Sequence, residues 1–207
     1  MEFPDRNLQS PSPPSAEPGT VFLETERLIL RRHQQSDAPD MAEIANYVEI
    51  FNGLRDRYPM PYTREEADKF IKRRCDPALQ TVYPVHVAIL VKPTSPGEKP
   101  RLVGSAGFMQ NDDVEYRTWN LGYWLTPSVW GHGYATEALS ALVKWVFATW
   151  PKLNRLESDV YGNNAASMKV LTKVGFIREG VKRGAAEKNG VLVDEVMFGF
   201  VRSDLEQ

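Results

Sequence analysis

The residues best suited to chemistry lie within residues 121–139, where a glycine-containing loop follows an apolar segment. Residues 121–125 are typical of a strand, Gly131 and Gly133 of a tight loop, and the residues after them of a helix. A helix that begins at glycines leaves its first N–H groups bare and points the positive end of its dipole outward. Glycine also lets a phosphate approach the main chain closely. The segment therefore predicts an anion site for a phosphorylated cofactor.

Other nucleotide and metal sites find little support in the sequence. The loop lacks the Gly-Lys-Ser/Thr ending of a triphosphate-binding P-loop, and it lacks the glycine fingerprint and acidic partner of a dinucleotide fold. The three histidines, His33, His86 and His132, are scattered and do not form an HExxH motif. Cys75 is the single cysteine, which excludes an internal disulfide and a cysteine-rich metal site. We expect no metal.

Length and composition indicate an ordinary globular domain. The chain has 207 residues, 42% of them hydrophobic and 25% charged, with a net charge of −2. That balance favours neither nucleic acid nor an anionic membrane as a partner. The longest apolar run, residues 85–91, is far shorter than the roughly 18 residues of a membrane helix. The N-terminus lacks the basic and apolar layout of a secretory signal, so we expect a cytoplasmic protein.

Two regions follow from composition. Residues 1–20 hold five prolines and several serines, which predicts a disordered or loosely draped tail, because proline removes backbone donors and few apolar groups are present to bury. Residues 21–207 are expected to form one domain. Hydrophobic periodicity, caps and turn signals predict its elements. Strands are expected over residues 25–31, 82–91, 102–109, 116–125, 156–161, 176–183 and 192–201. Helices are expected over residues 36–48, 63–74, 135–147 and 164–174.

Several segments in this order match one known family. They are Thr25–Arg31 (TERLILR), Leu121–Leu125 (LGYWL), Trp130–Leu139 (WGHGYATEAL), Asn164–Ser167 (NAAS) and Gly175-Phe176. Over about residues 21–204 the chain resembles the GNAT acyltransferases, and within them the RimJ/RimL-type branch. The resemblance implies an α+β fold with a mostly antiparallel, mixed, seven-stranded sheet. That sheet is splayed between its fourth and fifth strands and flanked by about four helices. It further implies acetyl-CoA as the cofactor and an amine as the acceptor.

The same resemblance assigns the cofactor contacts. The main-chain amides of residues 131–136 would wrap the diphosphate of coenzyme A, and an N–H near Leu125 would polarise the thioester carbonyl. Trp130 stands where the family usually has Arg or Gln. The cofactor-binding residues are then expected to be Leu125, Trp130, Gly131, His132, Gly133, Tyr134, Ala135, Thr136, Asn164 and Ser167.

The resemblance also places Asn164 on the pantetheine amide and Ser167 near the sulfur, where Ser167 would act as general acid for the departing thiolate. Judged from the residues alone, Asn164 caps a helix and Ser167 is its third residue. Tyr123 and Trp124 are expected to contact substrate. They alternate faces, so one lines the core and the other the acceptor channel, and the sequence does not show which.

The general base is the least determined residue. Glu115 is the first candidate, and the alternatives are Asp112, Asp113, Glu157, Asp194 and Glu195. The branch often carries an acid where this chain has Asn120. A weak base suffices for an α-amine, with a pKa of about 7.7–8.0, whereas a lysine amine, with a pKa of about 10.4, needs a stronger one.

Three functions remain open at this level. The first is direct acetyl transfer to a primary amine, either a protein N-terminus or a small molecule. The second is a non-catalytic sensor or scaffold that binds coenzyme A. The third is an aminoglycoside- or polyamine-type acetyltransferase, which an acidic acceptor pocket would favour. The protein is expected to be a monomer or a homodimer.

Overall fold

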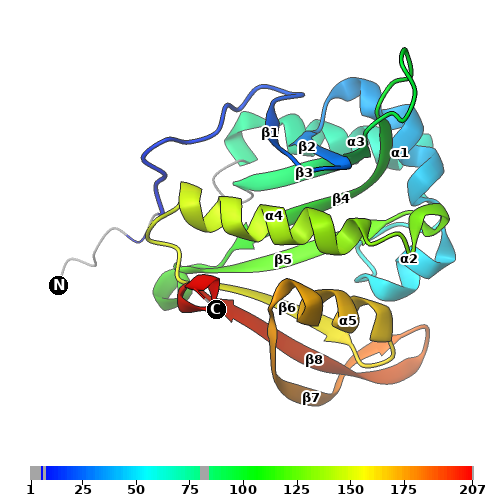
Figure 1. Ribbon diagram of the computed structural model, residues 1–207. Helices are drawn as coiled ribbons and strands as arrows, with labels where there is room; N and C mark the ends of the chain where they lie inside the picture. Colours follow the sequence, from blue (N-terminus) through cyan, green and yellow to red (C-terminus); the bar gives the residue numbers. More distant parts are fainter. Residues whose placement is uncertain (1–5, 7, 80–83, 207) are drawn as a thin grey trace.

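The computed structural model describes residues 6, 8–79 and 84–206, and its centre is a twisted sheet of eight strands (Figure 1). The strands are β1 (Val21–Glu24), β2 (Leu28–Arg32), β3 (Val85–Val91), β4 (Arg101–Gln110), β5 (Thr118–Leu125), β6 (Arg155–Tyr161), β7 (Ile177–Lys188) and β8 (Val191–Val201). Their order across the sheet is β1-β2-β3-β4-β5-β6-β8-β7. Neighbours are antiparallel except β5 and β6, which are parallel. The expected mostly antiparallel, mixed sheet is therefore confirmed.

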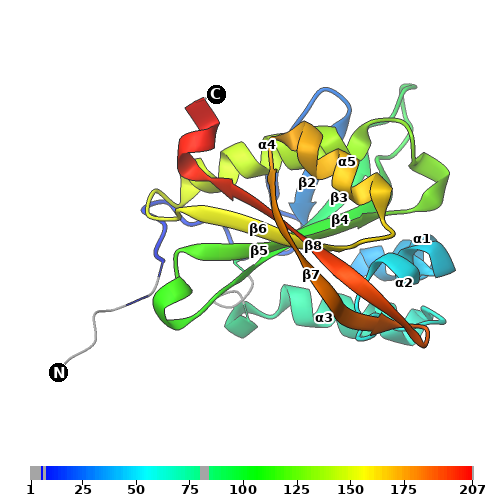
Figure 2. The same cartoon turned by 90° about the horizontal axis from the view of Figure 1, so that it is seen from below.

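Helices cover both faces of the sheet. They are α1 (Ala38–Ala45), α2 (Val48–Gly53), α3 (Arg64–Cys75), α4 (Tyr134–Thr149) and α5 (Ala165–Val174). Figure 2 shows α4 and α5 on one face and α1, α2 and α3 on the other. The larger core lies under α4, whose Leu139, Leu142 and Val146 are fully buried at helical spacing. A smaller core lies under α1 and α3 around Met41 and Ile71.

The sheet has one strand more than the seven expected. The stretch 25–31 is not one strand, because Thr25 closes a turn in which its hydroxyl accepts the Leu28 N–H at 3.0 Å. Its own N–H donates to the Leu28 carbonyl at 2.9 Å. The chain therefore reverses between β1 and β2, which pair antiparallel.

The described helices number five rather than about four, because the helix expected over residues 36–48 is interrupted. α1 stops at Ala45, and the Asn46 side chain accepts the Tyr62 N–H at 2.9 Å. Tyr47 is extended and starts the separate helix α2. Residues of this short helix line two cavities, which together form the candidate site.

The splay between β5 and β6 is also confirmed. The two strands pair only from Thr118↔Arg155 to Asn120↔Glu157. At the next position a side chain replaces the main-chain pairing, since the Ser158 hydroxyl donates to the Leu121 carbonyl at 3.1 Å. Beyond this point β5 runs on to Leu125 without a strand partner on that side, so a gap opens in the middle of the sheet.

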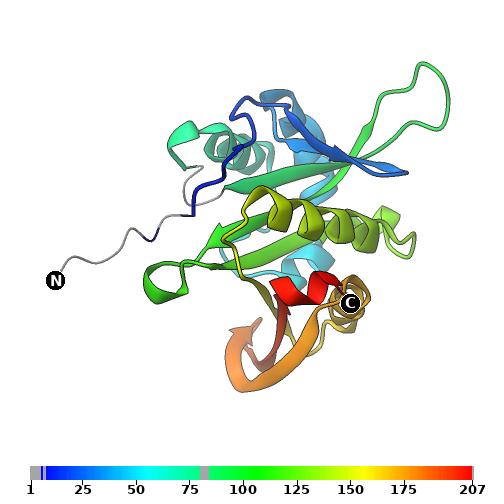
Figure 3. The same cartoon turned by 60° about the vertical axis from the view of Figure 1, so that its left-hand side comes forward.

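The last two strands form one edge of the sheet, and part of the N-terminal segment packs against the larger core. β7 and β8 form the expected hairpin at one edge of the sheet (Figure 3), through Asn189 and Gly190 with φ of 52° and 76°. At the other end Leu8 is buried in the larger core, and the Ser10 hydroxyl donates to the Thr149 carbonyl at 2.7 Å. The disorder of residues 1–20 remains a prediction, and residues 1–5 and 7 lie outside those described. No helix in the described part is long and apolar enough to cross a bilayer.

Candidate functional site

The first turn of α4 leaves its main-chain donors bare. Gly133, the N-cap, has φ of 80°, and so does Gly131, a conformation that glycine adopts without strain. Glu137 makes the first helical bond, to the Gly133 carbonyl at 3.0 Å. Within the described part of the chain, none of the N–H groups from Gly131 to Thr136 has a hydrogen-bond acceptor. Free donors at a helix N-terminus can bind an anion, and the anion site predicted from the sequence stays a prediction here.

These donors border a cavity of about 600 Å³ (the cofactor cavity) between the end of β5, α4, α5 and α2. It is lined by nine of the ten predicted cofactor residues: Leu125, Trp130, Gly131, Gly133, Tyr134, Ala135, Thr136, Asn164 and Ser167. The tenth, His132, does not line it. α2 adds residues that the sequence did not indicate, among them Glu49 and Asn52.

His132 and Arg27 stabilise the loop through contacts outside the cofactor cavity. The His132 ring stacks on Tyr134, and its Nδ1–H donates to the Trp130 carbonyl at 3.0 Å. Arg27, in the turn between β1 and β2, donates to the His132 carbonyl at 3.0 Å and to Glu137 at 2.7 Å. Its guanidinium lies 4.7 Å from the centre of the Tyr134 ring. The sequence does not indicate this supporting role of Arg27, although Arg27 lies in the segment Thr25–Arg31 that carries part of the family resemblance.

Charges around this loop are arranged for an anion. Burial alone would raise the pKa of Glu137, but hydrogen bonds from Thr25 and Arg27 outweigh it and lower that pKa. The carboxylate therefore stays ionised, and the Arg27 guanidinium at 2.6 Å offsets its charge beside the loop. Lys169 and Lys173, one turn apart on α5, line the same cavity and together outnumber the acidic Glu49 of α2.

Trp130 has a structural role in the loop. Its indole N–H donates to the Leu125 carbonyl at 2.8 Å. The ring is 48% exposed at the rim of the cavity. The bond ties the loop to the end of β5, next to the place where the strands separate.

Ser167 and Tyr123 meet across the gap. Asn164 caps α5 by accepting the Ser167 N–H at 3.1 Å, as expected for a capping residue. The Ser167 hydroxyl lies 2.8 Å from the Tyr123 hydroxyl. Burial raises the pKa of Tyr123 to about 12 despite that hydrogen bond, so the phenol stays protonated at neutral pH. The pair offers hydroxyl donors where the splayed strands open.

A second cavity of about 720 Å³ (the acceptor cavity) lies on the face of α3. The two cavities share four residues, Gly53, Leu54, Tyr123 and Trp124, so they adjoin at the splay. Trp124 packs with the core on the α1 and α3 face and meets Tyr58 edge-on at 6.2 Å. Both residues line both cavities, while Trp124 packs toward α1 and α3 and the Tyr123 hydroxyl reaches α5. Their contact with substrate stays a prediction.

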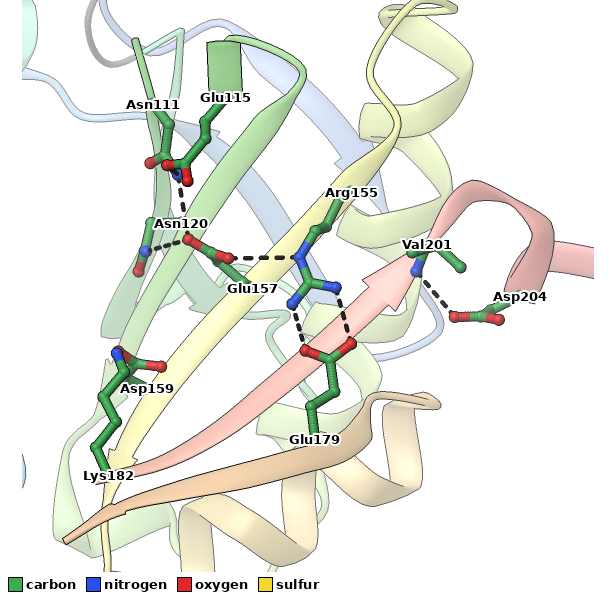
Figure 4. A network of polar contacts seen from close by, with 10 residues as sticks. All are labelled: Asn111, Glu115, Asn120, Arg155, Glu157, Asp159, Glu179, Lys182, Val201 and Asp204. Atoms are coloured by element: carbon green, nitrogen blue, oxygen red, sulfur yellow. Dashed lines mark hydrogen bonds and ion pairs between the residues drawn. The ribbon is translucent and has the colours of Figure 1, made fainter. Parts of the chain in front are cut away.

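The carboxylates are distributed differently from expectation. Glu115 is exposed near the start of β5, where Asn111 links it to Glu157 (Figure 4), and it lines neither cavity. Glu157 accepts hydrogen bonds from Asn111 and Asn120 and also stays outside both cavities. The only candidate base lining the acceptor cavity is Glu195 on β8. Its side chain is 8% exposed and lies 3.1 Å from Arg55.

His86 is a further residue of this cavity that the sequence did not single out. Its ring covers Gly107 so closely that a Cβ there would come within 2.5 Å of it. Burial, followed by the charges of Arg74 and His33, holds its pKa well below the usual range, so the ring is neutral. Among the described residues, no group of three or more His, Cys, Asp or Glu side chains is placed to hold a metal ion.

Comparison with known proteins gives a consistent match. Residues 27–177 fit the family model described as an acetyltransferase (GNAT) domain. An uncharacterized N-acetyltransferase of Bacillus licheniformis is 30% identical over 189 residues, which cover 88% of this chain and 97% of the relative.

Solved structures share the fold at lower identity. A ribosomal-protein alanine acetyltransferase from Vibrio fischeri superposes with a TM-score of 0.74 at 20% identity, covering 88% of this chain and 97% of its own. RimL, a ribosomal alpha-N-protein acetyltransferase in complex with coenzyme A, superposes with a TM-score of 0.71 at 20% identity, covering 87% of this chain and 97% of its own.

Proposed function

The chain belongs to the GNAT acetyltransferase family, whose members use acetyl-CoA, and on this premise we propose that it transfers acetyl directly to a primary amine. One observation carries the proposal. The bare N–H groups of Gly131 to Thr136 border a cavity that adjoins a second cavity at Tyr123 and Trp124. A phosphorylated acyl donor and an amine can therefore reach the same point from opposite faces of the sheet.

Each residue has a part in this mechanism. Acetyl-CoA supplies, when bound, a thioester whose carbonyl carbon accepts the amine. The N–H groups at the start of α4 hold the diphosphate, and the Leu125 N–H polarises the carbonyl. Ser167, backed by the Tyr123 hydroxyl, donates a hydrogen bond to the sulfur as it leaves. Glu195 takes the proton of the amine, in place of Glu115.

We favour an α-amine as the acceptor. Near pH 7.4 about a quarter of an α-amine with a pKa of about 7.7–8.0 is neutral, against roughly one part in a thousand for lysine. Glu195, which is already paired with Arg55, is a sufficient base for an α-amine and a weak one for a lysine amine. The fold shared with RimL, named for α-N-protein acetylation, agrees with this choice.

Transfer is proposed to be direct, without an acetylated cysteine. Burial raises the pKa of the Cys75 thiol, its Sγ lies 3.3 Å from the His33 carbonyl, and it lines neither cavity. The thiol is therefore protonated and away from the cofactor.

A panel of amines tests the proposal. The purified chain is incubated with acetyl-CoA and peptides or small amines, and both free thiol and acetylated product are measured. We expect equal amounts of each, with no acetyl group on Cys75. Tight binding of coenzyme A without turnover on any amine would instead favour the sensor. That alternative has its own support, because each carboxylate of the acceptor cavity already has an ion-pair partner.

A further inference from the structure

The acceptor cavity is strongly basic in a chain that carries a net charge of −2. Six cationic side chains line it: Arg55, Arg57, Lys69, Lys72, Arg73 and Arg74. Of the carboxylates that the structure describes, three do so: Glu66, Asp159 and Glu195. Basic residues are thus concentrated where the acceptor must bind.

The three carboxylates are already neutralised. Glu195 pairs with Arg55 at 3.1 Å, and Glu66 with Lys69 at 2.9 Å. Asp159 pairs at 2.6 Å with a lysine of β7 that does not line the cavity (Figure 4). None of them is left to balance the remaining cations.

Arg74 packs its guanidinium over the Phe70 ring. The other three cations face the cavity without a counter-charge among the described residues. Arg57 comes from the loop between α2 and α3, and Lys72 and Arg73 from the last turns of α3. None of the three forms an ion pair within the described residues. Positive charges that line a concave wall raise the local concentration of anions and repel cations.

From this charge pattern we propose that the acceptor is a primary amine that also carries an anionic group, a carboxylate or a phosphate, held by Arg57, Lys72 and Arg73. The inference rests on the proposed function and specifies its substrate class. The amine lies at the shared wall of Tyr123 and Trp124, and the anion lies toward the end of α3. A cavity of about 720 Å³ is large enough for a small molecule or the first residues of a peptide.

The same pattern argues against an aminoglycoside or a polyamine. Such polycations would need a surplus of carboxylates in the acceptor cavity, whereas the surplus here is of the opposite sign. Like charges brought together raise the free energy of the complex and so discriminate against that partner.

Matched acceptors test the inference. The peptides Ala-Glu-Glu-Ala, Ala-Gln-Gln-Ala and Ala-Lys-Lys-Ala, each with an amidated C-terminus so that only the side chains differ in charge, form one arm. O-phosphoethanolamine, ethanolamine and ethylenediamine form the other. We expect kcat/KM to be about tenfold higher for the anionic member than for the neutral one, since three exposed ion pairs together supply about that factor. The arm whose anionic member has the larger kcat/KM shows whether the acceptor is a peptide or a small molecule.

Variants test whether the three unpaired cations cause the preference for an anionic acceptor. Changing Arg57, Lys72 and Arg73 together to Gln should remove the preference for the anionic acceptor and leave the KM for acetyl-CoA unchanged. The double variant Lys144→Gln and Lys152→Gln, exposed and outside both cavities, should keep it. In the unmodified chain, added salt should raise the KM for the anionic acceptor but not for the neutral one.

The outcomes separate the two proposals. Acetylation of neutral or cationic amines as efficiently as anionic ones, or a preference that survives in the triple variant, would overturn the inference and leave the proposed function standing. Absence of acetylation on every amine would remove both.

Discussion

The hydrogen-bonded pair of Ser167 and Tyr123 allows a sharp test of the chemistry. Replacing Ser167 by Ala removes one hydroxyl that lies 2.8 Å from the Tyr123 hydroxyl, while the cap of α5 stays intact because the main-chain N–H of residue 167 still reaches Asn164. The variant therefore tests the donor at the sulfur without disturbing the helix that carries it.

The size of the effect follows from the charge on the leaving group. A hydrogen bond to a charged group is worth about 1.5–3 kcal/mol, which corresponds to a decrease in kcat of about 10- to 150-fold. Removing the Tyr123 hydroxyl with Tyr123→Phe should lower kcat too. The double variant should lose less than the product of the two single losses, because the hydroxyls act as one unit.

The assay is the release of free thiol at saturating acetyl-CoA and amine, with the Kd for coenzyme A measured by calorimetry. We expect kcat to fall while Kd changes less than about twofold, since the lost interaction forms only as the thiolate develops. Thr172→Ala is the matched control, because that exposed hydroxyl on the same helix bonds, among the described residues, only to the Met168 carbonyl. Unchanged kcat in Ser167→Ala, or a loss explained wholly by weaker cofactor binding, would refute the reasoning.

Three other variants test the remaining parts. Arg27→Ala frees the His132 carbonyl and should weaken coenzyme A binding about tenfold by calorimetry; an unchanged Kd in Arg27→Ala would mean that the loop needs no such support. Glu195→Gln should lower kcat/KM more at pH 6.5 than at pH 8.5, because an α-amine with a pKa of about 7.7–8.0 already loses its proton at the higher pH; a defect equal at both pH values would exclude Glu195 as base. Asp37→Asn should cost about 3 kcal/mol of unfolding free energy at pH 7 in urea. Burial alone would raise the pKa of Asp37, but hydrogen bonds from Arg31 outweigh it and hold that pKa far below normal. Its stabilisation is therefore full above about pH 3.9 and is lost as pH falls below that value, so the two proteins should converge in acid, and equal stability at pH 7 would contradict this.

Local signals made much of the fold predictable. The bare start of α4, the Asn164 cap and the Asn189-Gly190 turn each depend on neighbours in sequence. The break at Asn46 was missed, because the residue that stabilises it, Tyr62, lies far along the chain.

The site was predictable where it is built from main chain and not where distant side chains meet. Nine of the ten predicted cofactor residues line one cavity, because the loop and the α5 cap that carry most of them are local motifs. Arg27 is separated from its partner His132 by 105 positions. Glu195 of β8 lines the same cavity as residues of β5, and no sequence pattern distinguishes it from Glu115, which stays outside.

The central claim is that bare main-chain donors from Gly131 to Thr136 hold the diphosphate of coenzyme A. Calorimetric titration of the folded chain with coenzyme A and, separately, with pantetheine, which lacks the phosphates and the adenosine that they carry, tests it most directly. We expect coenzyme A to bind about a hundredfold more tightly, since two hydrogen bonds of about 1.5 kcal/mol to a charged group supply that factor. No uptake of coenzyme A, or equal affinity for both molecules, would contradict the account.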